Sequence, residues 1–280
     1  MAKVLKWFGI FIILLFAVIL VIYIKGMMHL DSTWDVKGSI TSVPSDSAII
    51  ERGHHLANIN GCTDCHGSDL SGKVFLDIPP FLAVASNLTT GKGGVGLNYD
   101  DSGWDKAMRH GVKSDGTGML VMPSKAFNNL SDKDAESIIA FIKSVPAVDN
   151  ELPATEYRFL GTMLAGMGEI NLADHIVTES TPKNAPEPDS TEVYGGYLAN
   201  ITCSYCHGQD FTGGPGEAPG ETIPGLQTAM TWGFDGFEKL LRTGKRPDGT
   251  EVSEMMPWQT FSHFTNSEMK ALYNYLQNYK

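Results

Sequence analysis

The chain has 280 residues, 42% of them hydrophobic, and a formal charge of −11. This length and apolar content exclude a disordered chain and predict about two domains, each with its own core. The acidic balance excludes nucleic acid as a partner, because binding phosphates requires basic groups. It favours either simple solubility or a basic docking partner.

The first predicted element is an apolar N-terminal helix. Eighteen uncharged residues run from Trp7 to Ile24, and as a helix they would span about 27 Å, close to the thickness of a bilayer core. Lys3 and Lys6 precede the run and favour an N-terminus inside the cell. A cleaved signal peptide is one alternative, but the run is long for a signal peptide and no A-x-A-like site follows. A buried helix of a soluble protein is another, but this run is apolar on every face.

We therefore predict an uncleaved anchor over residues 1–27, followed by a linker over 28–44. This arrangement describes a single-pass protein of the inner (cytoplasmic) membrane. Everything after the anchor would then face the periplasm or the outer side.

The remainder of the chain contains an internal repeat. Residues 53–72 match 195–213 with one residue deleted, and 103–142 match 236–276 with one residue inserted. Two homologous modules are implied. We expect a first module over 45–147, a connecting segment over 148–190 and a second module over 191–280.

Helices are predicted in both modules. Ser45 and Asp46 can cap a helix that carries the first cysteine motif at its end, and Ser131 caps a clearer one with an apolar face. Thr265 or Asn266 caps the counterpart of that second helix. Strands are scarcely signalled, so the expected fold class is all-α.

All four cysteines lie in two motifs, "CTDCH" and "CSYCH", which leaves none for a separate disulfide framework. A zinc clip would need four converging ligands, yet a whole module separates the motifs. A thioredoxin-like thiol pair would accompany a βαβ pattern, which is absent. Covalent haem c attachment explains both the cysteine spacing and the adjacent histidine, which can bind the iron. We predict two haems, held by Cys62, Cys65 and His66 and by Cys203, Cys206 and His207.

The sixth iron ligand is predicted from a Met–Pro pair that occurs once in each module, starting at Met122 and Met256. Each methionine lies five residues before a phenylalanine. A thioether ligand raises the reduction potential relative to harder ligands. Met119 and Met255 are the nearest rivals, but they do not align with each other.

Several other residues align between the modules and are candidates near the haems. Arg109 and Arg242 each lie two residues before a glycine and are expected either to pair with haem propionates or to remain solvated. Trp104 and Phe237 are expected to pack on the haem or in the core.

Prolines and histidines complete the candidate residues. Pro79 or Pro80, and Pro224, are expected to place a carbonyl against the second nitrogen of the ligand histidine and so fix its orientation. The remaining histidines considered are expected at the surface and not as ligands: His54, His55, His110, His175 and His263.

The haem motif, the Met–Pro pair and the closing helix together resemble the class I cytochrome c fold, present twice. More narrowly, "MPSKAFNNLSDKDAESIIAFIKSVP" resembles the di-haem and tri-haem cytochrome subunits of membrane-bound alcohol and aldehyde dehydrogenases. Those subunits often carry three haem motifs and a different membrane attachment, whereas this chain has two motifs and an N-terminal anchor. The resemblance implies a periplasmic electron conduit.

The expected function is therefore an electron carrier and not an enzyme, transferring single electrons in a respiratory chain. The expected donor is a dehydrogenase or a quinol-oxidising complex, and the acceptor a terminal oxidase, a reaction centre or a soluble cytochrome. One alternative is a di-haem peroxidase-like enzyme, which needs an open iron position. Another is an integral subunit of a larger respiratory or photosynthetic complex.

Overall fold

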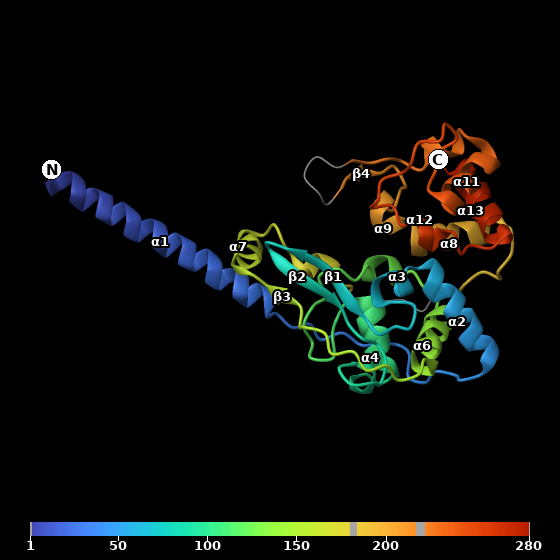
Figure 1. Ribbon diagram of the computed structural model, residues 1–280, viewed down its shortest axis with the longest axis horizontal. Helices are drawn as coiled ribbons and strands as arrows, with labels where there is room; N and C mark the ends of the chain where they lie inside the picture. Colours follow the sequence, from blue (N-terminus) through green and yellow to red (C-terminus); the bar gives the residue numbers. More distant parts are fainter. Residues whose placement is uncertain (1, 180–183, 217–221, 280) are drawn as a thin grey trace.

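The computed structural model describes residues 2–179, 184–216 and 222–279. A long helix, α1 (Ala2–Leu30), projects from a body of two modules, with the C-terminus in the second (Figure 1). Of the described helices, α1 is the one long and apolar enough to cross a membrane. It extends beyond the predicted apolar run at both ends.

The first module is built around two packed helices. Asp46 and Ser131 cap them, as the sequence predicts, each accepting hydrogen bonds from the first turn. The elements in chain order are α2 (Ser47–Ile59), α3 (Cys62–His66), β1 (Lys73–Ile78), β2 (Phe81–Ala85), the 3-10 helix η1 (Gly96–Asn98), α4 (Asp101–Asp105), the π-helix η2 (Lys106–His110), α5 (Ser124–Phe127) and α6 (Asp132–Ser144).

The second module repeats this plan after a connecting segment. Thr265 caps its last helix in a capping box with Glu268. The segment holds β3 (Glu156–Tyr157), α7 (Phe159–Met167) and the 3-10 helix η3 (Leu172–His175). The module holds α8 (Glu192–Thr202), α9 (Ser204–His207), β4 (Gly214–Pro215), β5 (Thr222–Ile223), α10 (Gln227–Met230), α11 (Gly233–Thr243), α12 (Trp258–Phe261) and α13 (Asn266–Asn278).

A small sheet qualifies the all-α prediction, although the chain is mainly helical as expected. Strands β1 and β2 form an antiparallel hairpin, in which Ile78 pairs with Phe81 across the Pro79–Pro80 turn. Strand β3 adds to β2. The stretch "KVFLDIPPFLAVA" carries the signal that the sequence analysis missed, because apolar and β-branched residues flank a turn-forming proline pair.

The segment expected as a linker is packed against the first module. Val36 and Ile40 are buried, and Thr33 forms a β-bridge with Thr117. His29, at the end of α1, accepts a hydrogen bond from the Leu172 backbone N–H through Nε2 at 3.0 Å. The end of α1 is therefore held by the connecting segment, and the chain that follows α1 by the first module, so that no free tether joins them.

The first and last helices of each module cross at a glycine. A Cβ at Gly53 would collide with the Ser137 carbonyl oxygen on α6, and a Cβ at Gly195 would collide with the Ala271 carbonyl oxygen on α13. Because the obstacle is backbone in both cases, a side chain cannot be accommodated by a rotamer change. The two modules thus use the same close crossing at equivalent positions.

Replacing Gly195 with alanine is therefore expected to destabilise the protein by about 1–3 kcal/mol through overpacking. Gly196→Ala is the matched control in the same helix, because its Cβ would meet the Tyr275 ring at 2.9 Å, a side chain that can shift. Both changes gain about the same helix propensity. Denaturant unfolding of the two variants measures the difference, and equal stabilities would contradict the crossing described above.

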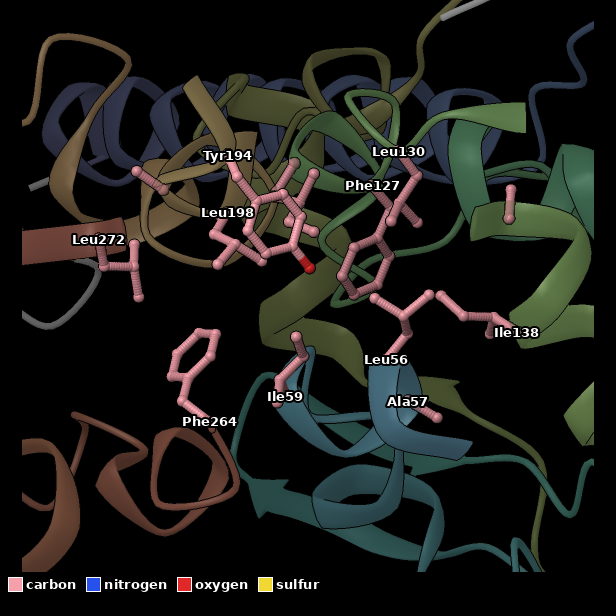
Figure 2. Packing of buried hydrophobic residues seen from close by; sticks show 14 of the residues in the cluster. Leu56, Ala57, Ile59, Phe127, Leu130, Ile138, Tyr194, Leu198, Phe264 and Leu272 are labelled. Carbon is pink, nitrogen blue, oxygen red and sulfur yellow. The ribbon is translucent and has the colours of Figure 1, made fainter. Parts of the chain in front are cut away.

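One hydrophobic cluster runs through both modules. Tyr194 and Leu198 of α8 lie beside Phe127, with Leu56 and Ile59 of α2 close by (Figure 2). All five side chains are at most 4% exposed. The modules consequently share a core and are not independent units joined only by the connecting segment.

Candidate functional site

The histidines of the two cysteine motifs are held by equivalent contacts. His66, at the end of α3, has its Nδ1 2.8 Å from the Ser86 carbonyl oxygen, and His207, at the end of α9, has its Nδ1 2.8 Å from that of Pro224. A carbonyl only accepts, so Nδ1 is the protonated nitrogen in both rings. The Nε2 lone pair is left for a metal ion, as second-sphere contacts arrange in metal sites.

The carbonyl partner was predicted correctly in the second module and wrongly in the first. Pro224 follows His207 by 17 residues, whereas Ser86 follows His66 by 20. The β1–β2 hairpin lengthens the first module here and places Pro79 and Pro80 in its turn. The Pro80 carbonyl instead accepts a hydrogen bond from the Arg158 backbone.

Burial sets the protonation state of both motifs. It lowers the pKa of His66 and of His207 below the ordinary imidazole value, which favours the neutral form that binds metals. Burial also raises the pKa of the Cys62 thiol to about 12 and that of Cys203 to about 11. A raised pKa disfavours the free thiolate that a redox-active thiol pair uses.

A zinc site finds no support in the arrangement of the ligand-type side chains. Among the described ranges, no group of three or more His, Cys, Asp or Glu side chains converges in a way that could hold a metal ion. A structural zinc site needs four such ligands.

An apolar pocket in the second module brings its candidate ligands together. Cys203, His207 and Met256 all line it, and the other lining side chains are apolar and come mainly from α11, α12 and α13. Met255, the rival methionine, is 66% exposed. The donor set and the apolar walls fit a covalently attached haem with histidine and methionine ligands.

The first module presents the equivalent residues in the same local structure. Cys62 and Met122 pack against the shared hydrophobic cluster. Pro123 has φ −79° and ψ 53°, against −80° and 63° for Pro257, so the two Met–Pro turns have the same backbone conformation. Trp104 is buried, and its Nε1 has no hydrogen-bond partner among the described atoms. A polar group of a bound cofactor would satisfy that donor.

Arg109, a candidate for a propionate contact, is buried among partners of its own chain. Its side chain is 1% exposed, and its guanidinium donates to Asp105 at 2.5 Å, to Asp132 at 2.7 Å and to the Ser39 hydroxyl at 2.8 Å. These three side chains hold the Arg109 guanidinium in the interior of the protein. The alternative of a solvated Arg109 is therefore wrong, whereas the propionate contact stays a prediction.

Arg242 occupies the equivalent position and binds backbone. Its Nη1 donates to the Ser262 and Phe264 carbonyls at 2.5 and 2.7 Å, and its Nη2 donates to the Asn266 side chain at 2.8 Å. It ties α11 to the start of α13. Its propionate contact stays a prediction.

Of the histidines expected at the surface, His110 is buried and His55 is half-buried. His110 is 1% exposed, and its Nδ1 lies 2.5 Å from the Val177 carbonyl. His55, on α2, has its Nε2 2.8 and 3.0 Å from the carboxylate oxygens of Glu268 on α13. The second contact joins the two modules.

The contact between the modules has approximate two-fold symmetry. Tyr197 stands in α8 where His55 stands in α2, and its hydroxyl donates to Asp134 at 2.7 Å. Asp134 in turn lies three residues after its cap, as Glu268 does. Each module thus offers one side chain to the first turn of the other module's last helix, as in a contact between two copies of one protein.

This symmetry brings each cysteine motif next to the other module. Helix α5, just after the first Met–Pro turn, packs against α9, which carries the second motif. Its counterpart α12 packs against α2, and the Thr260 hydroxyl of α12 donates to Asp64 within the first motif. The two candidate cofactor sites therefore meet at one interface.

Acid should weaken this interface through Glu268. Burial acts to raise the pKa of Glu268, but hydrogen bonds from His55 and Thr265 outweigh it and hold the pKa below the ordinary 4.5. A depressed carboxyl pKa contributes stability that is present above the unfolded value and lost as pH falls through the folded value. We expect Glu268→Gln to remove about 1–2 kcal/mol at neutral pH.

The measurement is the free energy of unfolding between pH 7 and pH 3. The difference between the native chain and Glu268→Gln should shrink below about pH 4.5. Glu254→Gln, at an exposed acid of the same module, is the control. A difference that stays constant with pH would contradict this role for Glu268.

The fold and the site together define a chain of two similar helical modules, each with a cysteine–histidine motif and a Met–Pro turn. The model of the cytochrome c family matches residues 50–146 and 193–280, which is more than half of the chain. The chain therefore belongs to the cytochrome c family, a family of electron-transfer proteins, as the resemblance implied.

Curated relatives of this chain include cytochrome subunits of dehydrogenases. The chain is 27% identical over 257 residues to the fructose dehydrogenase cytochrome subunit of Gluconobacter japonicus, covering 82% of this chain and 52% of the relative. It is 24% identical over 271 residues to the cytochrome c subunit of the quinone alcohol dehydrogenase of Gluconacetobacter polyoxogenes, covering 84% and 56%. The chain thus spans about half the length of these two relatives, which are cytochrome subunits of the kind expected.

A third relative is a much larger protein, one of the subunits of the nicotinate dehydrogenase of Pseudomonas putida. The chain is 24% identical to it over 288 residues, covering 90% of this chain and 23% of that protein. All three relatives are named as parts of dehydrogenases.

Proposed function

We propose that this protein is a membrane-anchored di-haem cytochrome that relays single electrons between redox proteins on the periplasmic side of the membrane. The observation that carries the proposal is the pocket lined by Cys203, His207 and Met256, together with its matching residues in the first module. Cys62, Cys65, Cys203 and Cys206 would hold the two haems, which supply reversible one-electron iron chemistry.

Each iron would be bound by one histidine and one methionine, His66 with Met122 and His207 with Met256. The carbonyl contacts of both histidines keep the ring orientation and tautomer fixed during oxidation and reduction. The apolar surroundings disfavour the extra positive charge of ferric iron and so raise the reduction potential. Both features suit a carrier that changes charge without changing ligands.

The shared interface supports electron exchange between the two sites. Contacts of α5 with α9 and of Thr260 with Asp64 bring the motif of one module against the methionine side of the other. Electron exchange requires short distances between redox centres. An electron entering at one module could thus leave from the other without dissociation of a partner.

The anchor and the relatives support the proposed orientation and partners. Lys3 and Lys6 before the apolar run favour an inside N-terminus, which puts both modules outside the cytoplasm. Relatives named as dehydrogenase subunits support a dehydrogenase as electron donor. A quinol-oxidising complex is a further candidate donor, and a terminal oxidase, a reaction centre or a soluble cytochrome are candidate acceptors.

Two alternatives lead to different observations. A peroxidase-like enzyme needs an open iron position, whereas both Met–Pro turns have the same conformation here. An integral subunit of a larger complex would stay with its neighbours after extraction in mild detergent. On native gels, a freely diffusing carrier would migrate alone.

The proposal is tested by intact-mass spectrometry combined with a potentiometric titration of the full chain. We expect the mass of the chain plus two covalently bound haems, and two one-electron steps. A mass with one haem, or turnover of peroxide at an iron with an open position, would overturn it.

A further inference from the structure

Helix α7 is an apolar helix of the connecting segment and lies outside both stretches that the cytochrome c family model matches. Its nine residues, "FLGTMLAGM", include no charged side chain. One face is buried and carries Gly161, Thr162, Ala165 and Gly166. The other face is apolar as well, and there Phe159 is 63% exposed, Leu160 46% and Met167 52%. A helix face in contact with water normally carries polar residues, so this exposed face needs another environment.

The buried face of α7 packs against the outer end of the anchor helix. A Cβ at Gly26 would collide with the Thr162 carbonyl, and one at Gly166 would collide with the Ile22 carbonyl. The rings of Tyr23 and Phe159 stack with centroids 5.5 Å apart. Small residues at a close helix crossing are typical of helices that associate in membranes. The position of α7 along α1 is therefore fixed.

That position corresponds to the boundary of the bilayer. The contacting residues of α1 lie between Ile22 and Gly26, about 6 Å along the helix axis, and the apolar run ends at Ile24. When α1 spans the membrane, α7 lies at the level where acyl chains meet head groups. Exposed Lys25 and Met28 share this level and suit the same boundary.

We propose that α7 lies in the outer interface of the bilayer, with Phe159, Leu160 and Met167 among lipid acyl chains. This inference rests on the proposed membrane anchor and adds a second lipid contact to it. Lipid is the favoured occupant because the exposed face of α7 continues the lipid-facing surface of α1. Arg158 closes the N-terminal end of α7 with a charge, paired with Asp77 at 2.7 Å.

The first module is consequently held against the membrane. Arg158 donates to the Ile78 carbonyl at 2.6 Å, and a Cβ at Gly161 would collide with the Pro80 carbonyl, which ties α7 to the β1–β2 hairpin. Figure 1 shows α7 and the hairpin beside the end of α1, with the second module farther away.

The test is photo-crosslinking of the full chain in nanodiscs of phosphatidylcholine that include a phosphatidylcholine with a diazirine on its acyl chain. Trypsin separates the peptide Trp7–Lys25 from the peptide that begins at Phe159. We expect lipid adducts on both peptides, and Met167→Glu should reduce those on the second peptide only. Val193→Glu, at an apolar residue of the second module that is 71% exposed, is the control that should change neither.

The outcomes separate the inference from the proposal on which it rests. Adducts on Trp7–Lys25 with none on the Phe159 peptide of the native chain would overturn the interfacial position of α7 and leave the anchor intact. Absence of adducts from both peptides would overturn the anchor as well. Adducts on the Phe159 peptide that Met167→Glu leaves unchanged would also contradict the assigned face.

Discussion

Met256→Ala is expected to lower the reduction potential of the second haem and to abolish its methionine–iron absorption band. The thioether stabilises ferrous iron relative to harder ligands such as water, and axial ligation controls potentials over a span of about 0.8 V. The expected shift is a sizeable fraction of that span. Potentiometric titration followed by optical spectroscopy measures it.

The neighbouring methionine supplies the matched control for this change. Met255 precedes Met256 directly but is 66% exposed and does not line the pocket. Met255→Ala should leave both the potential and the band unchanged. If Met255→Ala removed the band and Met256→Ala did not, the ligand assignment would be wrong.

Arg109→Ala is expected to destabilise the protein by about 3–5 kcal/mol, because it leaves a buried carboxylate without its partner. Asp105 is fully buried and accepts from Arg109, from the Ser39 backbone at 2.7 Å and from the Ile40 backbone at 3.3 Å. Removing the guanidinium strips the charge compensation and loosens the segment that follows α1. Denaturant unfolding of the purified holoprotein gives the value.

Arg242→Ala is the comparison for Arg109→Ala. Arg242 is 30% exposed, and its nearest carboxylate, Glu238, lies 3.8 Å away. Its loss removes hydrogen bonds to two carbonyls without leaving a buried charge unpaired, so about 1–3 kcal/mol is expected. Equal losses of unfolding free energy in the two variants would contradict an added stabilisation from the buried ion pairs of Arg109.

The features predicted from sequence are those with local causes. Asp46, Ser131 and Thr265 cap the helices that they were expected to cap, because a cap acts within one turn of its own chain. The repeat predicted two modules because both copies carry the same cysteine motif, Met–Pro pair and helix-cap residues. The cysteine motif is also local, as both sulfurs and the histidine lie within five residues.

Features that depend on distant partners were missed or misplaced. His110 and His55 were expected at the surface, but their partners, Val177 and Glu268, lie 67 and 213 residues away. No pattern near either histidine indicates such a partner. The carbonyl partner of His66 was predicted at Pro79 or Pro80 instead of Ser86, because the β1–β2 hairpin lengthens this loop in the first module only. An alignment of the repeats does not show how such an insertion changes the path of a loop.

The interface between the modules was likewise not predicted from the sequence. Once the structure brings the His55 side chain of α2 to α13 and the Tyr197 side chain of α8 to α6, the symmetry of the interface follows from the repeat, since the two residues occupy equivalent positions. Their side chains differ, one an imidazole and the other a phenol, and yet each reaches a carboxylate in a first helical turn. The duplicated positions have thus kept the contact geometry with different chemistry.

The most direct test of the whole account is low-temperature EPR combined with near-infrared magnetic circular dichroism on the oxidised protein. Two six-coordinate haems with His66 and Met122, and with His207 and Met256, should give low-spin ferric signals and a methionine–iron band for each iron. A high-spin iron, or a missing methionine–iron band at either site, would contradict a carrier with both axial positions filled.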